Sequence, residues 1–454
     1  STMKILSMNA AGTGLVWCAL LGASTAGSSQ TSLSLAEAQD KALDQAYAME
    51  RALIDVEVAR RDVKELLATG LPQVTGSVDF NHFIDIPTQV VPASSFDPTA
   101  PEDMVLEFSF GTTQSLTAGL NATQLIFSGS YLVGVQAAKV LADAKDLAVE
   151  RTAVDTRRMV AEAYATALAA QANVATLDKA LTLVAQSESE LRAMSQEGFL
   201  ESVDADRLTL TRQTLEQQLG TARLQAELTA KLLLFQCGMS VDSDVELPYP
   251  LADLTPGEAP AAVQAQLTSA TVPSLQEQQQ YVALAELDVK NRRAEGLPQI
   301  AGFYSTSQQA FRDPDFPVLE DQNNWYPNQI VGLSMSMPVW TSFGGRQRFE
   351  KAKLQVLNAQ SGYRQMVEAA KLEFDNAKAT FLDAEAALRT AREQRDLASR
   401  ILERIEAGHK EGVRSSFELN DAQNQLIESE GNLIGAQLAW LNAQQRLIAS
   451  NPQP

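Results

Sequence analysis

Two long stretches of the chain repeat their apolar residues at steps of three and four. Leu208, Leu215 and Leu219 show this spacing in the first stretch, which covers residues 102–247, and the second stretch covers residues 339–451. Neither stretch contains proline, and both are rich in Ala, Leu, Gln, Glu and Arg, which are strong helix formers. The pattern therefore predicts amphipathic α-helices in both stretches.

One of these helices is predicted to be unusually long. From Ser130 to Gln196 the helical pattern contains no stop signal, and at about 1.5 Å per residue such a helix would span roughly 100 Å. Helices of that length normally belong to coiled coils or bundles. A run of small residues between Ala161 and Ala170 would allow neighbouring helices to approach closely.

Strict alternation of apolar and polar residues marks a second kind of segment. In the clearest example, Val331 and Leu333 alternate with Gly332 and Ser334. Alternation with a period of two predicts a strand with one apolar face and one polar face. The segments with this pattern are 71–84, 106–121, 299–307 and 329–340.

The order of these elements occurs twice along the chain. The sequence GLPQV at 70–74 recurs as GLPQI at 296–300, and the Glu-Gly pair at 197–198 recurs at 411–412. Each half reads helix, strand, loop, strand, very long helix, glycine turn, helix, which predicts an internal duplication. We expect a first repeat, a proline-rich linker and a second repeat, at residues 34–238, 239–273 and 274–450.

Strands with one apolar face suit a membrane β-barrel, provided that the barrel closes and leaves no edge. The four predicted strands of one chain cannot close a barrel, because the smallest membrane barrels have about eight. Two chains would give about eight strands around a bore filled with side chains, and three would give about twelve around an open lumen. The pattern therefore predicts an oligomer, and a conduit favours the trimer.

An export signal is predicted for residues 1–26. Lys4 precedes an apolar segment at 15–21, and small residues stand at Ser24 and Ala26, the −3 and −1 positions of a cleavage site. The alternative is a buried N-terminal helix, but the segment is rich in glycine and lacks helical periodicity.

Composition narrows the possible functions. The chain has 454 residues and a formal net charge of −20, which argues against nucleic acid as the main partner. Cys18, Cys237, His82 and His409 are too scattered for a Cys/His zinc site, although a carboxylate-only metal site stays open. Trp17 is too bulky for the position before a lipid-attachment cysteine, which argues against lipidation of Cys18. No nucleophile–base pair or phosphate-binding loop is present, so we predict neither an enzyme nor a cofactor.

Taken together, these features resemble the TolC family of outer-membrane efflux proteins. The resemblance rests on the paired Leu-Pro-Gln strand starts, the strand exits at 125–129 and 339–345, and the duplicated long-helix hairpins, and it covers roughly residues 34–450. It implies a mainly α-helical homotrimer whose twelve-stranded outer-membrane barrel continues into a periplasmic α-helical coiled-coil tunnel. It further implies a Gram-negative outer membrane, a periplasmic adaptor (membrane fusion protein) and an inner-membrane pump of RND or ABC type, in tripartite efflux or type I secretion.

The resemblance also implies a gate at the periplasmic end, where acidic side chains ring the pore. Glu418 and Asp421 occupy the positions of the family's paired acids, and their spacing places both on one helix face. In the first repeat Asp204 matches Glu418, but Arg207 stands where Asp421 would be. The alternative is that these acids form an ordinary solvated helix face.

Two further sets of residues are expected at surfaces. The resemblance implies adaptor docking at the turns around Gly198 and Gly412. Trp325, Tyr326 and Trp340 flank the second strand pair, which predicts membrane-interface positions; Trp340 has the alternative role of packing at the strand-to-helix junction.

Other classes of protein would show other patterns. A periplasmic adaptor would carry one coiled-coil hairpin without duplicated amphipathic strand pairs, and a purely structural coiled-coil protein would lack the strands. The transported substrate, whether drug, metal or protein, is not indicated by the sequence.

Overall fold

The computed structural model describes residues 31–96, 98–99, 101, 103–109, 111–197, 202–255, 263–264, 267, 271–312 and 325–452. The predicted export signal at 1–26 and the turn residue Gly198 lie outside the described residues.

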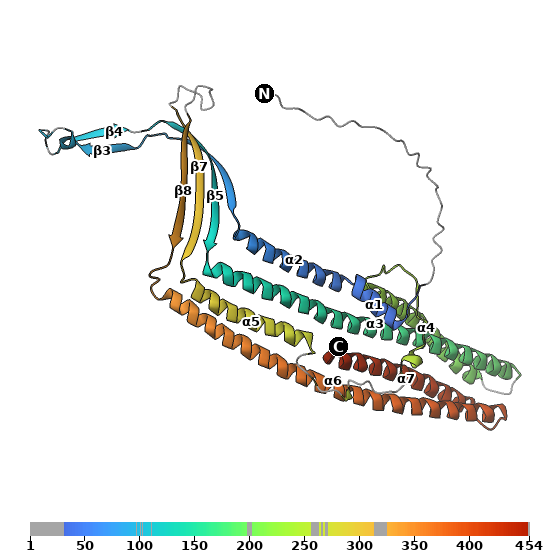
Figure 1. The fold of residues 1–454 in the computed structure, drawn as a ribbon. Helices are drawn as coiled ribbons and strands as arrows, with labels where there is room; N and C mark the ends of the chain where they lie inside the picture. The colour runs from blue at the N-terminus through green and yellow to red at the C-terminus, as the bar shows by residue number, and fades with distance from the viewer. Residues whose placement is uncertain are drawn as a thin grey trace, which may run out of the picture.

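Seven α-helices form most of the described chain (Figure 1). Two of them, α3 and α6, have 68 and 67 residues, which corresponds to about 100 Å each. The expected long helix from Ser130 to Gln196 is therefore confirmed, with its first residue one position earlier. The helices are α1 Leu35–Gln45, α2 Tyr47–Thr69, α3 Gly129–Gln196, α4 Ser202–Gln236, α5 Pro273–Ala294, α6 Gly344–Lys410 and α7 Ser416–Ser450. None of the described helices contains a segment that is both long and apolar enough to cross a lipid bilayer.

A four-stranded antiparallel sheet stands at one end of the helices (Figure 1). Its strands are β2 Gln73–His82, β5 Gln114–Phe127, β7 Gln299–Arg312 and β8 Tyr326–Ser336, in the order β2-β5-β7-β8. Each strand joins one helix: α2 precedes β2, α3 follows β5, α5 precedes β7 and α6 follows β8. The order of the strands across the sheet is thus repeated by the helices beneath it, where α3 contacts both α2 and α5, and α5 contacts α6.

Two smaller strand pairs and two short turns are also present in the described chain. The strands β3 Thr88–Pro92 and β4 Val105–Ser109 form a separate hairpin that projects from the far end of the sheet (Figure 1). The short strands β1 Thr31–Ser32 and β6 Val245–Glu246 pair in parallel near the middle of the helices. The 3₁₀ turns are η1 Ala93–Ser95 and η2 Leu251–Leu254.

Three of the expected strands differ from those in the structure. The expected strand 299–307 continues to Arg312, because its pairing with β5 extends that far. The segment 106–121 is not one strand, because Gly111, at a φ of +139°, separates β4 from β5 and β4 turns away to pair with β3. The expected strand 329–340 ends at Ser336, just before Pro338, whose nitrogen carries no hydrogen for the ladder.

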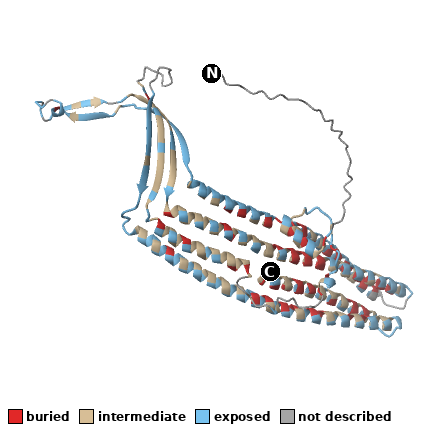
Figure 2. Cartoon of the chain, viewed as in Figure 1, coloured by how far each residue is buried: buried red, intermediate tan, exposed pale blue. Residues whose placement is uncertain are grey.

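The buried residues concentrate in the middle of the helical body (Figure 2). Trp440 of α7 and Phe381 of α6 lie with their ring centroids 5.6 Å apart. Tyr164 of α3 donates a hydrogen bond to the Leu33 carbonyl at 3.1 Å, and burial raises the pKa of this tyrosine to about 12. This core fixes α1, α3, α6 and α7 together and leaves the two ends of the molecule to smaller contacts.

Candidate functional site

The sheet has one apolar face and one polar face. The register pairs Val74 with Ala122, Ala122 with Tyr304, and Tyr304 with Val331, so these residues share a face. The apolar side chains of this face are not covered by the rest of the chain: Val331 is 80% exposed and Leu333 is 75% exposed. The opposite face carries mainly Ser, Thr and Asn, as the alternation predicted.

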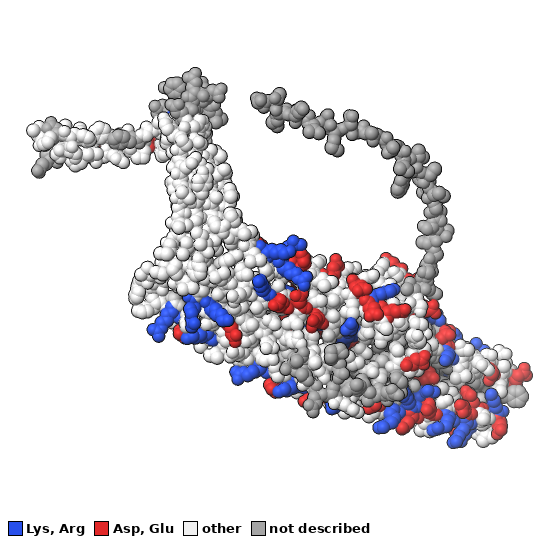
Figure 3. Space-filling view, in the orientation of Figure 1, with Lys and Arg blue, Asp and Glu red and all other residues white. Residues whose placement is uncertain are grey.

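The same sheet is almost free of charge. Asp79 and Arg312 are the only Asp, Glu, Lys or Arg residues within β2, β5, β7 and β8. Figure 3 shows an uncharged column of side chains above a helical body covered with acidic and basic groups. An apolar face of this kind is stable only where something other than water covers it.

Both edges of the sheet are open within the described chain. β2 pairs only with β5, and β8 pairs only with β7, so each edge strand has one unpaired row of backbone N–H and C=O groups. β2 runs away from the helices and β8 runs toward them, so that the two edges would pair in antiparallel fashion with a second copy (Figure 1).

The structure places the three expected interface aromatics at opposite ends of β8. Trp325 and Tyr326 lie where β8 begins, and the Tyr326 ring lies 6.0 Å from that of Phe311. Trp340 lies beyond the other end of the strand, is 72% exposed, and contacts the Phe343 ring edge-on with the centroids 5.1 Å apart. At about 3.3 Å per residue the eleven residues of β8 span roughly 33 Å, near the thickness of a hydrocarbon core.

Glu418 lies in the first turn of α7, at the end of the helices far from the sheet, and helps to cap this helix. Ser415 caps α7, with the Glu418 N–H donating to Ser415 Oγ at 3.3 Å and the Ser415 N–H donating to Glu418 Oε2 at 2.9 Å. Arg414 Nη1 donates to the other carboxylate oxygen at 2.8 Å. The bond from the Ser415 backbone and the bond from Arg414 lower the pKa of Glu418 below its ordinary value. The Ser-x-x-Glu spacing is the sequence signal of this capping box, and the prediction of a gate residue overlooked it.

The other expected tip residues are placed to different degrees. Asp421 is exposed one turn further along α7 and accepts a hydrogen bond from Gln425 at 2.8 Å. Gly412 has a φ of +76° in the turn from α6 to α7, a conformation that favours glycine. Asp204 lies within α4, but its side chain is outside the described residues.

A buried ion-pair cluster lies near the same tip and was not expected. Glu188 of α3 has a side chain only 8% exposed and accepts from Arg212 Nε of α4 at 2.7 Å and from Thr209 Oγ1 at 2.8 Å. Arg192 Nη2 lies 2.9 Å from the same carboxylate. Burial raises the pKa of Glu188, but the bonds from Thr209 and Arg212 outweigh this effect and lower it overall. The sequence gives no signal for this cluster, because a charged residue in a helical pattern normally lies in solvent.

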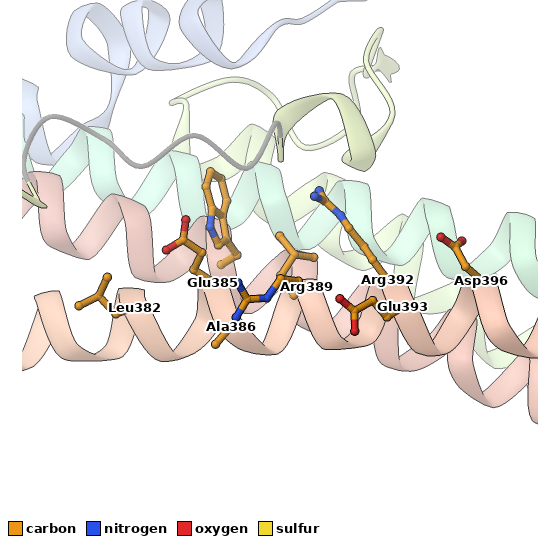
Figure 4. Close-up of a pocket in the computed structure, with 9 residues that line it drawn as sticks. Leu382, Glu385, Ala386, Arg389, Arg392, Glu393 and Asp396 are labelled. Atoms are coloured by element: carbon orange, nitrogen blue, oxygen red, sulfur yellow. The ribbon is translucent and has the colours of Figure 1, made fainter.

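A surface groove of about 560 Å³ lies beside Trp440, along one face of α6 (Figure 4). Acidic and basic side chains alternate along it, with Glu385, Arg389 and Glu393 among its lining residues. Across the described ranges, no group of three or more His, Cys, Asp or Glu side chains is placed to hold a metal ion.

Comparisons with known proteins agree with this architecture. Residues 265–450 match the family model described as outer membrane efflux protein. No curated protein matches the chain. Among solved structures, a membrane protein from Pseudomonas aeruginosa superimposes with a TM-score of 0.71 at 16% identity, over 92% of each chain. The outer membrane protein VceC from Vibrio cholerae has a TM-score of 0.69 at 16% identity, over 92% of this chain and 95% of VceC.

A third structure, the open state of the MtrE outer membrane channel of Neisseria gonorrhoeae, gives a TM-score of 0.69 at 16% identity, over 92% of this chain and 91% of MtrE. At this identity the structural likeness concerns the fold, and it extends over 92% of the chain, whereas the family match is confined to residues 265–450. The resemblance read from the sequence is thus confirmed: residues 265–450 match the outer membrane efflux protein family model, and the chain as a whole has the same fold as these solved outer-membrane proteins.

Proposed function

We propose that three copies of this chain form an outer-membrane exit duct. One observation carries the proposal: a sheet with an exposed apolar face, almost no charge and two open edges cannot be stable in water as a single copy. Lipid around the apolar face and a second copy at each edge would remove both problems.

The number of copies follows from the number of strands that a closed barrel with an open lumen needs. Pairing β2 of one copy with β8 of the next extends the sheet without changing its antiparallel pattern. Three copies would give a barrel of about twelve strands, wide enough for an open lumen lined by the polar face. Since each strand continues into one helix, the barrel would continue into a ring of helices and form a tunnel about 100 Å long in the periplasm.

The far end of this tunnel is the proposed gate and docking site. Glu418 and Asp421 would contribute six carboxylates around the threefold axis, a ring that favours cations. The exposed Phe417 and Val413 lie in or beside the turn at Gly412, where a periplasmic adaptor would dock. In this arrangement the adaptor joins the duct to an inner-membrane pump, and the duct itself needs no catalytic residue.

Neighbouring residues on β8 provide the test. Leu333 lies on the apolar face and Ser334 on the polar face, so Leu333→Lys and Ser334→Lys introduce the same charge on opposite sides of one strand. In lipid, Leu333→Lys should cost about 2 kcal/mol per copy and reduce the yield of heat-resistant trimers from membranes. Ser334→Lys should leave trimers intact and weaken cation selectivity in planar bilayers. Equal behaviour of the two variants, or a wild-type chain that purifies as a soluble monomer without detergent, would contradict the proposal.

A further inference from the structure

A group of basic side chains lies where the sheet meets the helices. Residues 286–295 at the end of α5 and 344–353 at the start of α6 contain seven basic and four acidic residues, although the chain as a whole has a net charge of −20. Figure 3 shows these basic groups gathered at the foot of the uncharged column. We call the exposed cations of this group the basic collar: Lys290, Arg293, Arg346, Arg348, Lys351 and Lys353.

Most acidic residues near the collar already form ion pairs with basic residues of the same group. Glu295 lies 2.7 Å from Arg292 and 3.5 Å from Arg348, and Asp288 also pairs with Arg292. Glu350 pairs with Lys353 at 3.1 Å. Four collar cations have no ion-pair partner in the part of the chain that the structure describes: Lys290, Arg293, Arg346 and Lys351.

Apolar and aromatic side chains adjoin these cations. Phe349 lies between two collar cations, with Arg293 5.3 Å and Lys353 4.4 Å from its ring centroid. Trp340 and Phe343, both strongly exposed, lie in the segment between β8 and α6. The collar therefore combines unpaired cations with an aromatic rim directly beside a surface that the proposed function places in lipid.

We infer that the basic collar binds the headgroups of anionic phospholipids in the periplasmic leaflet of the membrane. The inference rests on the proposed function, which puts the foot of the sheet at that leaflet. Guanidinium and ammonium groups recognise phosphate, and exposed aromatic rings settle at the headgroup level. The collar should therefore bind anionic lipids more tightly than zwitterionic lipids at the foot of the sheet.

Quenching of Trp340 by brominated lipids tests the inference on the full-length assembly. Trp17→Phe and Trp325→Phe leave Trp340 as the only exposed tryptophan, because Trp440 is fully buried. The protein is placed in phosphatidylcholine vesicles that contain increasing mole fractions of brominated phosphatidylglycerol or brominated phosphatidylcholine. We expect half-maximal quenching at a mole fraction about fivefold lower for the anionic lipid.

A charge-neutral variant and a matched control complete the experiment. Replacing the four unpaired collar cations with glutamine should make the two quenching curves coincide, whereas the same change at four exposed cations of the distal helices should leave the preference intact. The control residues are Lys179, Arg400, Arg404 and Lys410.

The outcomes separate the two proposals. Equal quenching by both lipids in the otherwise unmodified protein, or an unchanged preference after the four collar cations are removed, would overturn the inference while leaving the duct in the membrane. The absence of quenching by either lipid would mean that Trp340 does not reach a bilayer, and would overturn the proposed function together with the inference.

Discussion

At the scale of single residues, the most informative groups lie outside the four-stranded sheet. Cys237 at the end of α4 is fully buried and its Sγ lies 3.6 Å from the Ala38 carbonyl oxygen. Burial raises the pKa of this thiol to about 11. A thiol that is both inaccessible and protonated at neutral pH should be inert as a nucleophile.

We therefore predict that Cys237 does not react with a maleimide at pH 8 in the folded protein and reacts fully after denaturation. Mass spectrometry of the chain, with Cys18 replaced by serine, measures the fraction that carries the label. Moving the thiol to the exposed position Ser240 in a Cys237→Ser background should restore rapid labelling. Complete labelling of native Cys237 would contradict the burial of α4 against α1.

Glu188 should make the tip hairpin of α3 and α4 sensitive to acid. Its pKa is lowered in the folded state, so its contribution to stability is present above the unfolded pKa, near 4.5, and is lost as the pH falls through the folded value. Glu188→Gln should remove an interaction of about 1.4 kcal/mol at pH 7, which corresponds to roughly tenfold faster amide exchange in the hairpin.

Hydrogen exchange of peptides from α3 and α4 measures this difference. The wild type and Glu188→Gln should converge as the pH falls through the lowered pKa of Glu188, once intrinsic exchange rates are corrected, because protonation then neutralises the wild-type carboxylate as well. Glu190→Gln, two residues further along α3 at an exposed position, is the matched control. A difference that persists at acid pH would show that Glu188 acts by shape and not by charge.

At the scale of elements, the gate prediction has to separate charge from helix capping. Glu418 both carries a charge and closes the capping box with Ser415, so alanine at this position would disturb α7 as well as the proposed ring. Glutamine keeps a side chain that can accept the capping hydrogen bond and removes only the charge.

Glu418→Gln combined with Asp421→Asn should therefore weaken the cation selectivity of single channels and raise their conductance, while the helix content stays unchanged. Planar-bilayer recordings at two salt gradients give both quantities. Glu428→Gln, at an exposed position two turns further along α7, serves as the control. Wild-type selectivity in the double variant would place the constriction elsewhere.

The elements themselves could largely be read from the sequence, because each depends on local periodicity. Leucine spacing and the absence of proline fix α3 to within one residue of the expected start. The alternation around Val331 and Leu333 correctly predicts that both lie on one face of a strand. These features need no knowledge of what packs against them.

What the sequence could not supply depends on contacts between distant segments. The alternation in 106–121 is real, but it does not reveal that β4 pairs with β3 and leaves the main sheet at Gly111. The burial of Glu188 depends on Arg212 and Thr209, which lie on another helix. The basic collar could not be predicted either, because its residues lie on α5 and α6, which are distant in the sequence and meet only in the folded chain.

At the scale of the whole molecule, the proposed function requires that the sheets of three copies close into one barrel. One chain presents a sheet that is apolar on one side and unpaired at both edges, above two helices of about 100 Å each. In a closed trimer the edges pair, the apolar face meets lipid and the polar face surrounds a lumen. The proposed gate, docking tips and lipid-binding collar would all take their positions from this arrangement.

Cryo-electron microscopy of the protein purified from membranes and held in lipid nanodiscs tests this arrangement most directly. We expect particles with threefold symmetry, in which β2 of each copy pairs with β8 of the next and one continuous central cavity runs from the sheet into the helices. Particles of any other symmetry, or threefold particles whose β2 and β8 edges remain unpaired, would contradict it.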